Sequence, residues 1–275
     1  MMRSWDAEPV PSVAEPQPRR AAGIAYERIG EGPPLLLVHG LGATRAIWRP
    51  QLEALTPHRD VIAVDLPGFG ASPELAASPT PWALAAALAD LCAELGVARP
   101  HIAGNSLGGW VAVEMAKAGH AESLCLISPA GLWRRPLGPR RRDAHRWARR
   151  LRPAVMAMAA FTPLRRAMLR SSIGRPERVP ADAGRAMIAA WIDAPGYVAA
   201  NAEMRRYVCE DPDEVTAPTT IVWGDLDRLV AAPRPERRPP GSRYLRVAGI
   251  GHTPNWDDPG LVARLLLEAS APVAA

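Results

Sequence analysis

The chain has 275 residues, 48% of them hydrophobic, and carries a formal net charge of +5. A chain of this length and apolar content can bury one substantial core, so we expect one core domain. Almost all of the positive charge is arginine, with Lys117 as the single lysine. The charge therefore reflects composition at least as much as a phosphate-binding surface, and it does not by itself indicate a nucleic-acid partner.

The cysteine content and the first residues of the sequence favour a cytoplasmic protein. Cys92, Cys125 and Cys209 are odd in number and lie in no zinc-binding spacing, which argues against a disulfide framework and a metal site. Residues 1–20 are rich in proline and lack the apolar segment of a signal peptide, so we expect a disordered tail there. No apolar run reaches the roughly 18 residues needed to span a bilayer.

The first elements predicted after this tail are a hairpin and two buried strands separated by a helix. Residues 23–32 alternate weakly and end in a glycine-rich turn, which suits a short hairpin leading into the next strand. The continuous apolar runs at 33–40 and 60–68 are typical of strands buried on both faces. Between them, residues 45–55 carry apolar side chains at helical spacing.

Strands and helices continue to alternate along the rest of the chain. Residues 81–96 have proline at the first helical position and glycine at the end, the asymmetry expected of a helix. Further strands are predicted at 101–106, 123–130, 219–225 and 243–249, and further helices at 110–119 and from about 259. This alternation predicts an α/β fold with a mostly parallel central sheet flanked by helices.

One long segment interrupts the alternation. Between about residues 132 and 209 the strand signals stop, while arginines, tryptophans and methionines accumulate over several predicted short helices. Structureless connections longer than roughly 15 residues are uncommon, so we expect a helical insertion rather than a loop. The predicted organisation is a core over 21–132 and 210–275, with a helical cap over 133–209.

The sequence GNSLGG at 104–109 places a serine where a predicted strand turns into a predicted helix. Gly104, Ser106 and Gly108 form a G-x-S-x-G motif, and strand, motif and helix together make a nucleophile elbow. The glycines remove Cβ atoms that would collide with neighbouring backbone. The N–H of Leu107 then lies at a helix N-terminus, where an anion is stabilised. The alternative is that GNSLGG forms a sharp turn and that Ser106 has no catalytic role.

A serine nucleophile needs a general base, and the base needs an orienting carboxylate. Of the six histidines, only His252 follows the last predicted strand, in a loop able to reach back over the sheet. The acid is expected at the end of the preceding strand, where Asp225 and Asp227 occur. We expect Asp227, which lies deeper in the loop, and keep Asp225 as the alternative. Turn formation could also explain either aspartate.

Acyl transfer also requires two backbone donors for the tetrahedral oxyanion. Leu107 supplies one of them. The loop HGLGAT after the first buried strand can aim the N–H of Leu41 as the second. We interpret His39 in that loop as a packing and hydrogen-bonding residue that shapes the turn.

Five motifs stand in the order found in the α/β-hydrolase superfamily, which the chain resembles over residues 23–267: HGLG, VDLPGFGAS, GNSLGGW, WGDLDRLV and GHTPNWDDP. The resemblance implies an α/β-hydrolase fold with a helical cap over the pocket. A serine at the elbow separates the chain from haloalkane dehalogenases and epoxide hydrolases, which have aspartate there. The implied catalytic triad is Ser106, Asp227 and His252, and the implied oxyanion donors are Leu41 and Leu107.

Two reactions within the superfamily are compatible with these motifs. GNS followed by a hydrophobic residue and GG, with Trp256 four residues after His252, resembles the C–C hydrolases of meta-cleavage products. The loop GLGAT departs from the G-x-GPG pattern of those enzymes, and carboxylesterases share the other motifs. We therefore expect hydrolysis of small to medium hydrophobic carboxylic esters through an acyl-enzyme, with C–C hydrolysis as the alternative. A non-hydrolytic ligand-binding module is a third hypothesis, since fold does not fix function.

The predicted cap combines positive charge with apolar side chains. Nine arginines occur from Arg134 to Arg152, interleaved with Trp133 and Trp147. They are either a gate for anionic substrates or a solvated helix face, and we favour the solvated face.

Candidate substrate-binding residues are Trp256 and, in the cap, Met158 and Trp191, although packing of the cap explains such residues equally well. No cofactor or metal is expected, and the absence of a P-loop argues against nucleotide binding. The expected partner is a small hydrophobic ester or acid, with no nucleic acid and no membrane span.

Overall fold

The protein is built on an eight-stranded sheet with the strand order β1-β2-β4-β3-β5-β6-β7-β8. The computed structural model describes residues 18–139 and 144–271. Strands β3 to β8 run parallel, whereas β1 and β2 are antiparallel to their neighbours. The strands are β1 Arg19–Ala21, β2 Ile24–Ile29, β3 Pro34–Val38, β4 Asp60–Val64, β5 His101–Asn105, β6 Ser123–Ile127, β7 Thr219–Gly224 and β8 Arg243–Val247. The predicted mostly parallel α/β sheet is confirmed.

The predicted hairpin forms the antiparallel edge of the sheet. It reverses at Ala22 and Gly23, both of which have a positive φ. Arg19 and Arg20 belong to β1, so the sheet begins inside the tail expected over 1–20, because these residues pair with Tyr26 and Ala25. Residues 1–17 of that expected tail lie outside the described residues. The hairpin continues along β4 rather than β3, although β3 follows it in the sequence.

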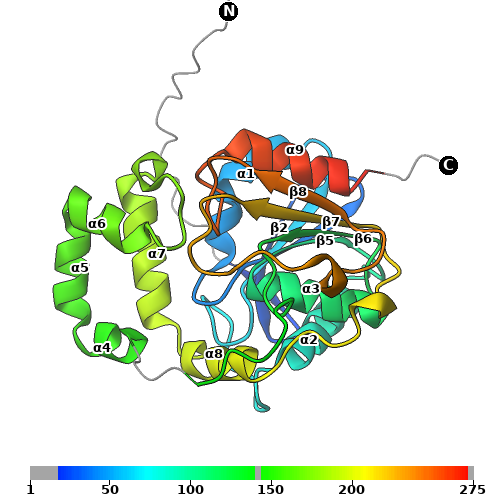
Figure 1. Ribbon diagram of the computed structural model, residues 1–275, viewed down its shortest axis with the longest axis horizontal. Helices are drawn as coiled ribbons and strands as arrows, with labels where there is room; N and C mark the ends of the chain where they lie inside the picture. Colours follow the sequence, from blue (N-terminus) through cyan, green and yellow to red (C-terminus); the bar gives the residue numbers. More distant parts are fainter. Residues whose placement is uncertain (1–17, 140–143, 272–275) are drawn as a thin grey trace, which may run out of the picture.

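Helices cover both faces of the sheet (Figure 1). On one face, α2 (Pro81–Glu94) packs beside α3 (Leu107–Lys117), and on the other, α1 (Arg49–Leu55) packs beside α9 (Pro259–Ala269). The helix predicted over 45–55 is divided, because residues Arg45–Trp48 form a 3-10 turn before α1. The segment therefore tightens its first turn rather than forming one regular helix.

Side chains of the central strands alternate between these two helix layers, as the pleat of a strand requires. In β3, Leu36 and Val38 join the cluster formed with α2 and α3, while Leu35 and Leu37 join the cluster formed with α1 and α9. All four side chains are buried. Their burial on both faces explains why the central strands appear in the sequence as continuous apolar runs.

Five helices lie between β6 and β7, beside the end of the sheet toward which β7 and β8 point (Figure 1). They are α4 Ala144–Arg150, α5 Arg152–Ala160, α6 Thr162–Leu169, α7 Ala181–Asp193 and α8 Tyr197–Arg206, and we call them the cap. The first four share a small core that includes Ala159, Leu169 and Ile188. Close to where the segment leaves and rejoins the sheet, the N–H of Cys209 donates to the carbonyl of Gly131 at 2.8 Å. The boundaries at 133 and 209 stay a prediction.

The structure also bears on two questions raised by the sequence, a membrane span and the reactivity of the cysteines. Over residues 18–139 and 144–271, no helix combines the length and apolar character required to cross a bilayer. Cys92, Cys125 and Cys209 are free and buried, and burial raises the pKa of the Cys125 thiol to about 12. These thiols are therefore protonated at neutral pH, which makes them poor nucleophiles.

The close approach of β7 to the following loop generates a prediction about stability. A Cβ at Gly224 would overlap the backbone of Ile250. Gly224→Ala should therefore lower the free energy of unfolding by about 1–3 kcal/mol, the usual cost of overpacking. Gly260→Ala is the control, because a Cβ there would lie 3.7 Å from its nearest neighbour and alanine favours the helix by up to about 1 kcal/mol. Urea denaturation midpoints measure both changes; equal destabilisation would contradict the prediction.

Candidate active site

Ser106 lies at the abrupt turn between β5 and α3. Its backbone has φ 53° and ψ −115°, in the region that L-residues seldom adopt. Neighbouring glycines allow the turn, because a Cβ at Gly104 would overlap the carbonyl of Gly108, and a Cβ at Gly108 would overlap that of Val38. The strand and helix of the motif can therefore approach so closely only with glycine at these two positions.

Backbone hydrogen bonds hold this strained turn in place. The N–H of Ser106 donates to the carbonyl of Ile127 at the end of β6, at 3.0 Å. The carbonyl of Ser106 accepts the N–H of Gly109 at 3.0 Å and that of Ala130 at 2.8 Å. Strain of this kind persists only where the surroundings over-determine the conformation, and here three segments do so.

The proposed oxyanion donors lie next to the serine. Leu107 is the first residue of α3, so its N–H belongs to the helical turn whose donors have no carbonyl partner within the helix. On the other side, a Cβ at Gly40 would lie only 3.1 Å from the Cβ of Ser106, which shows how closely the loop containing Leu41 approaches. The two N–H groups thus come from segments that meet at the serine.

His252 and Asp227 form a buried pair. The Nδ1 atom of His252 lies 2.8 Å from Oδ2 of Asp227, and the two side chains are only 5% and 1% exposed. The other carboxylate oxygen, Oδ1, accepts the N–H groups of Leu229 at 2.8 Å and Val230 at 3.0 Å. Because Nδ1 faces a carboxylate, it carries the proton, and Nε2 is left as an acceptor.

The surroundings of Asp227 keep this carboxyl group ionised. Burial by itself would raise its pKa, but the hydrogen bond and charge of His252 and the N–H groups of Leu229 and Val230 outweigh burial and hold the pKa below its usual range. A carboxylate that is charged and fixed on both oxygens can orient an imidazole and stabilise its protonated form.

Asp225 occupies a different position from Asp227. It is exposed, and its Oδ1 accepts the N–H of Gly249 at 2.7 Å, while its own N–H donates to the carbonyl of Val247 at 3.0 Å. These contacts close the end of β7 onto the end of β8. Of the two candidate acids, the structure brings Asp227 to His252 and gives Asp225 a loop-closing arrangement.

Asn105 links the serine to the loop that carries His252. Its Nδ2 atom donates to the carbonyl of His252 at 2.8 Å and to that of Ile127 at 3.1 Å. Its Oδ1 atom accepts the hydroxyl of Thr253 at 3.2 Å. Asn105 directly precedes Ser106, so this side chain fixes the backbone of the histidine beside the nucleophile. The sequence analysis quoted this residue within GNSLGG but assigned it no role.

A buried carboxylate joins the same loop to the cap. Asp257 is fully buried and accepts the N–H groups of Gly174 at 3.0 Å, Arg175 at 2.6 Å and Gly251 at 2.7 Å. The N–H of Thr253 also donates to the carbonyl of Ser172 at 2.8 Å. No local signal marks Asp257 for this position, because the two partners that join it to the cap, Gly174 and Arg175, are about 80 residues away along the chain.

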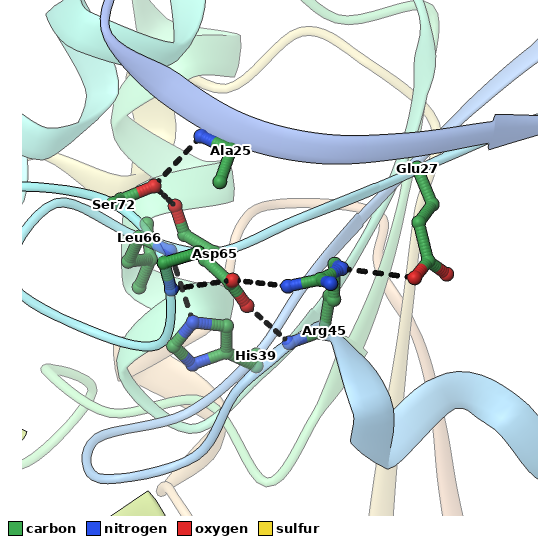
Figure 2. Close-up of polar contacts among 8 residues, drawn as sticks. Ala25, Glu27, His39, Arg45, Asp65, Leu66 and Ser72 are labelled. Atoms are coloured by element: carbon green, nitrogen blue, oxygen red, sulfur yellow. Dashed lines mark hydrogen bonds and ion pairs between the residues drawn. The ribbon is translucent and has the colours of Figure 1, made fainter. Parts of the chain in front are cut away.

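His39 supports the loop that contains Leu41, and Figure 2 shows its contact with Leu66. Its Nε2 atom accepts the N–H of Leu66 at 2.9 Å, so the proton lies on Nδ1, which donates to the carbonyl of Gly40 at 2.7 Å. Burial is the main cause that lowers the pKa of His39. The imidazole is therefore neutral and fixes the carbonyl beside Leu41, as the sequence analysis expected of a residue that shapes the turn.

A buried ion pair lies beside this histidine (Figure 2). The carboxylate of Asp65 contacts the guanidinium of Arg45 and also accepts the N–H of Arg45 at 2.8 Å and that of Ala71 at 2.9 Å. The guanidinium continues to Glu27 at 3.1 Å. Asp65 directly follows β4 and precedes Leu66, so the ion pair fixes the segment that donates to His39.

Of the three predicted pocket residues, Trp191 and Trp256 both pack against the core of the cap, whereas Met158 does not. Trp191 of α7 packs against the loop of the proposed oxyanion donor, since a Cβ at Gly42 would lie 2.7 Å from its ring. Trp256 is half-buried against the core of the cap, and its indole N–H is buried without a hydrogen-bond partner among the described residues. Met158 of α5 is 41% exposed, and the described contacts do not bring it to the site. Helix α5 packs on α6 and α7 through Val155 and Ala159, and a role of Met158 in substrate binding stays a prediction.

The fold and these motifs agree with a comparison against known families. Residues 35–265 match the alpha/beta hydrolase family. The chain belongs to this family. In the described part of this alpha/beta hydrolase, no group of three or more His, Cys, Asp or Glu side chains is placed to hold a metal ion.

Two proteins that are similar to this alpha/beta hydrolase in sequence have names that state an activity. The chain is 26% identical over 247 residues to the dihydrolipoyllysine-residue acetyltransferase component of the acetoin cleaving system of Cupriavidus necator, which covers 83% of this chain and 61% of that protein. It is 40% identical over 95 residues to the pimeloyl-[acyl-carrier protein] methyl ester esterase of Aeromonas salmonicida. That match covers 34% of this chain and 35% of the esterase. The chain thus spans less than two thirds of either relative.

A solved structure matches over more of its length. It is the malate-bound thermophilic esterase from Thermogutta terrifontis, with 28% identity and a TM-score of 0.68. The match covers 89% of this chain and 92% of the esterase. The similarity therefore includes both the sheet and much of the cap.

The neutral state of His39 predicts how stability depends on pH. Folding lowers the pKa of His39 below 6.5, so at acidic pH the unfolded chain binds a proton that the folded chain does not. The free energy of unfolding therefore falls as the pH drops below about 6.5, with a limiting slope of about 1.4 kcal/mol per pH unit. Glutamine can still accept from Leu66 but does not titrate, so His39→Gln should show a shallower loss. Urea denaturation at pH 7.5, 6.5 and 5.5 measures both slopes, and equal slopes would refute the assignment.

Proposed function

We propose that the protein is a cofactor-independent serine hydrolase that cleaves small to medium hydrophobic carboxylic esters through an acyl-enzyme. The observation that carries this proposal is the buried His252–Asp227 pair at 2.8 Å, held by Asn105 beside the strained turn of Ser106. A packing role alone would not require a serine at a strained turn next to a loop that carries a histidine paired with a carboxylate. The similarity to two named esterases supports the same reaction class.

In the proposed mechanism, Oγ of Ser106 attacks the ester carbonyl carbon while Nε2 of His252 takes the hydroxyl proton. The carbonyl oxygen becomes an oxyanion, which the N–H groups of Leu41 and Leu107 stabilise. His252 returns the proton to the alkoxide as the bond to the alcohol breaks. Water then attacks the acyl-enzyme with the same histidine as base and releases the acid.

The residues around this site support an apolar acyl group. Trp191 packs on Gly42 in the loop of Leu41, and it stands edge-on to Tyr197 with ring centroids 6.0 Å apart. Leu41 itself is half-buried against the main core. Aromatic and aliphatic walls bind hydrocarbon chains through burial and give no preference for a charged acyl group.

Trp256 supports a second candidate reaction, the hydrolysis of a C–C bond in a vinylogous diketone acid. Its buried indole N–H has no hydrogen-bond partner within residues 18–139 and 144–271, and it is available to donate to a polar group of such a substrate. The same triad would serve both reactions. Initial rates on chromogenic esters of graded chain length, compared with a meta-cleavage dienoate, separate them: faster turnover of the dienoate would favour C–C hydrolysis.

The assignment of the nucleophile predicts the behaviour of Ser106→Ala. An alanine fits the same turn, so the variant should keep its circular dichroism spectrum while kcat falls by about 10⁶-fold, as for other serine nucleophiles. A fluorophosphonate probe should label the wild type and leave the variant unlabelled. Label on another serine would contradict the assignment, and an unlabelled wild type would favour the non-hydrolytic binding module.

The two aspartates predict unequal effects. Asp227→Asn removes the charge that faces His252 and can stabilise the wrong tautomer, so kcat should fall by about 10³ to 10⁴-fold. Asp225→Asn is the matched control, since an amide oxygen can still accept from Gly249, and its kcat should change much less. A larger loss at Asp225 would assign the acid to that residue instead.

A further inference from the structure

The positive charge of the chain is concentrated in helices α4 to α6. Residues 144–170 contain seven arginines and no aspartate or glutamate. This local charge exceeds the net charge of +5 of the whole chain, so the remaining sequence is slightly acidic. A cationic segment of this kind attracts anions wherever its guanidinium groups reach the surface.

Some of these arginines have partners inside the protein. Arg152 forms two hydrogen bonds with Asp193, at 2.6 and 2.7 Å. Arg165 is buried and donates to the carbonyls that end α5, including that of Ala159 at 3.1 Å. Arg149, Arg150 and Arg166 are exposed in the last turns of α4 and α6, where a cation is also stabilised by the helix dipole.

Large apolar side chains are exposed among these arginines. In the described part of the chain ten large hydrophobic side chains are exposed, and five of them fall between residues 147 and 164. They are Trp147 and Phe161, each 65% exposed, with Leu151 at 52%, Leu164 at 44% and Met158 at 41%. Such clustering departs from the isolated apolar residues that ordinary protein surfaces carry.

The exposed apolar side chains lie on α5 and at its two ends. Met158 lies within α5, and Leu151 and Phe161 flank the helix at its N- and C-terminal caps. Other side chains of α5, those of Val155, Met156 and Ala159, pack inside the cap. Figure 1 shows α5 at the outer edge of the molecule, with α7 between it and the sheet. Helix α5, with exposed apolar residues on it and at both of its ends, therefore forms part of the outer surface of the cap.

We propose that this outer face of α4 to α6 docks onto an anionic lipid surface. The arginines pair with lipid phosphates, while Trp147, Phe161 and the aliphatic side chains enter the headgroup region. A second copy of the chain fits this face less well, because two such faces would bring the exposed Arg149, Arg150 and Arg166 of one copy against the same cations of the other. Docking does not depend on the proposed esterase activity, since no residue of the Ser106 site takes part in it.

The test uses the full chain and vesicles of phosphatidylcholine, alone or mixed with phosphatidylglycerol. The wild type should sediment with the mixed vesicles and remain in solution with the neutral ones, and raised salt should release it. The triple variant Arg149→Gln, Arg150→Gln, Arg166→Gln should bind roughly 100-fold more weakly. The matched control replaces three exposed arginines elsewhere, Arg234, Arg246 and Arg264, by glutamine and should retain most of the binding.

Trp147→Ala and Trp82→Ala separate insertion of the apolar side chains from charge attraction alone. Trp82 is also exposed, at 46%, but lies on α2. Trp147→Ala should weaken binding and Trp82→Ala should not, with circular dichroism confirming that both variants fold. The proposal is overturned if the wild type does not bind the mixed vesicles, or if the control variants lose as much binding as the cap variants.

Two competing occupants give distinct results. A wild type that forms dimers in sedimentation velocity, through Trp147 and without binding vesicles, would assign the face to a second copy. Binding to polyglutamate without binding to vesicles would assign it to an acidic protein. Either result would assign a different binding partner to this face and overturn the proposal.

Discussion

The site depends on how closely α3 approaches the central strands. That approach requires the absence of side chains at Gly104 and Gly108, whose Cβ atoms would overlap backbone of the elbow and of β3. It forces Ser106 to a φ of 53° and sets its hydroxyl at the carboxyl end of the parallel strands. The packing that buries Leu36 and Val38 beneath the helices is therefore the same packing that strains the serine. Stability of the core and geometry of the nucleophile cannot be varied independently.

Buried polar groups then fix the loops around this point. Asp227 accepts three hydrogen bonds, Asn105 makes three, and Asp65 contacts an arginine and two N–H groups. Each would be costly to bury without partners, so each selects one conformation of the loop it joins. Pre-organisation of this kind is what an oxyanion site needs, because donors already in place require no rearrangement as charge develops.

Much of the fold could be predicted from the sequence, because buried parallel strands and a glycine-flanked elbow are local patterns. The pairing of Asp227 with His252 followed from chain order and loop depth. Asn105 and Asp257 were missed, since their partners lie in loops far along the chain. The position of Met158 could not be predicted for a related reason: a methionine on an amphipathic helix gives no information about which face meets the core. Tertiary packing alone decides that Val155 turns inward and Met158 outward.

Asp257 has a consequence for how the cap can move. Its carboxylate binds the N–H groups of Gly174 and Arg175 in the cap and of Gly251 beside the histidine. Lifting residues 172–175 away would remove two of the three N–H donors of this buried carboxyl group, at a cost of about 1–3 kcal/mol for each lost hydrogen bond. This part of the cap and the His252 loop therefore travel as one rigid body. A further contact of the cap with the loops at the end of the sheet is made by Trp191 of α7 and Tyr197 of α8 against Gly42, and among the described residues it contains no buried carboxylate of this kind.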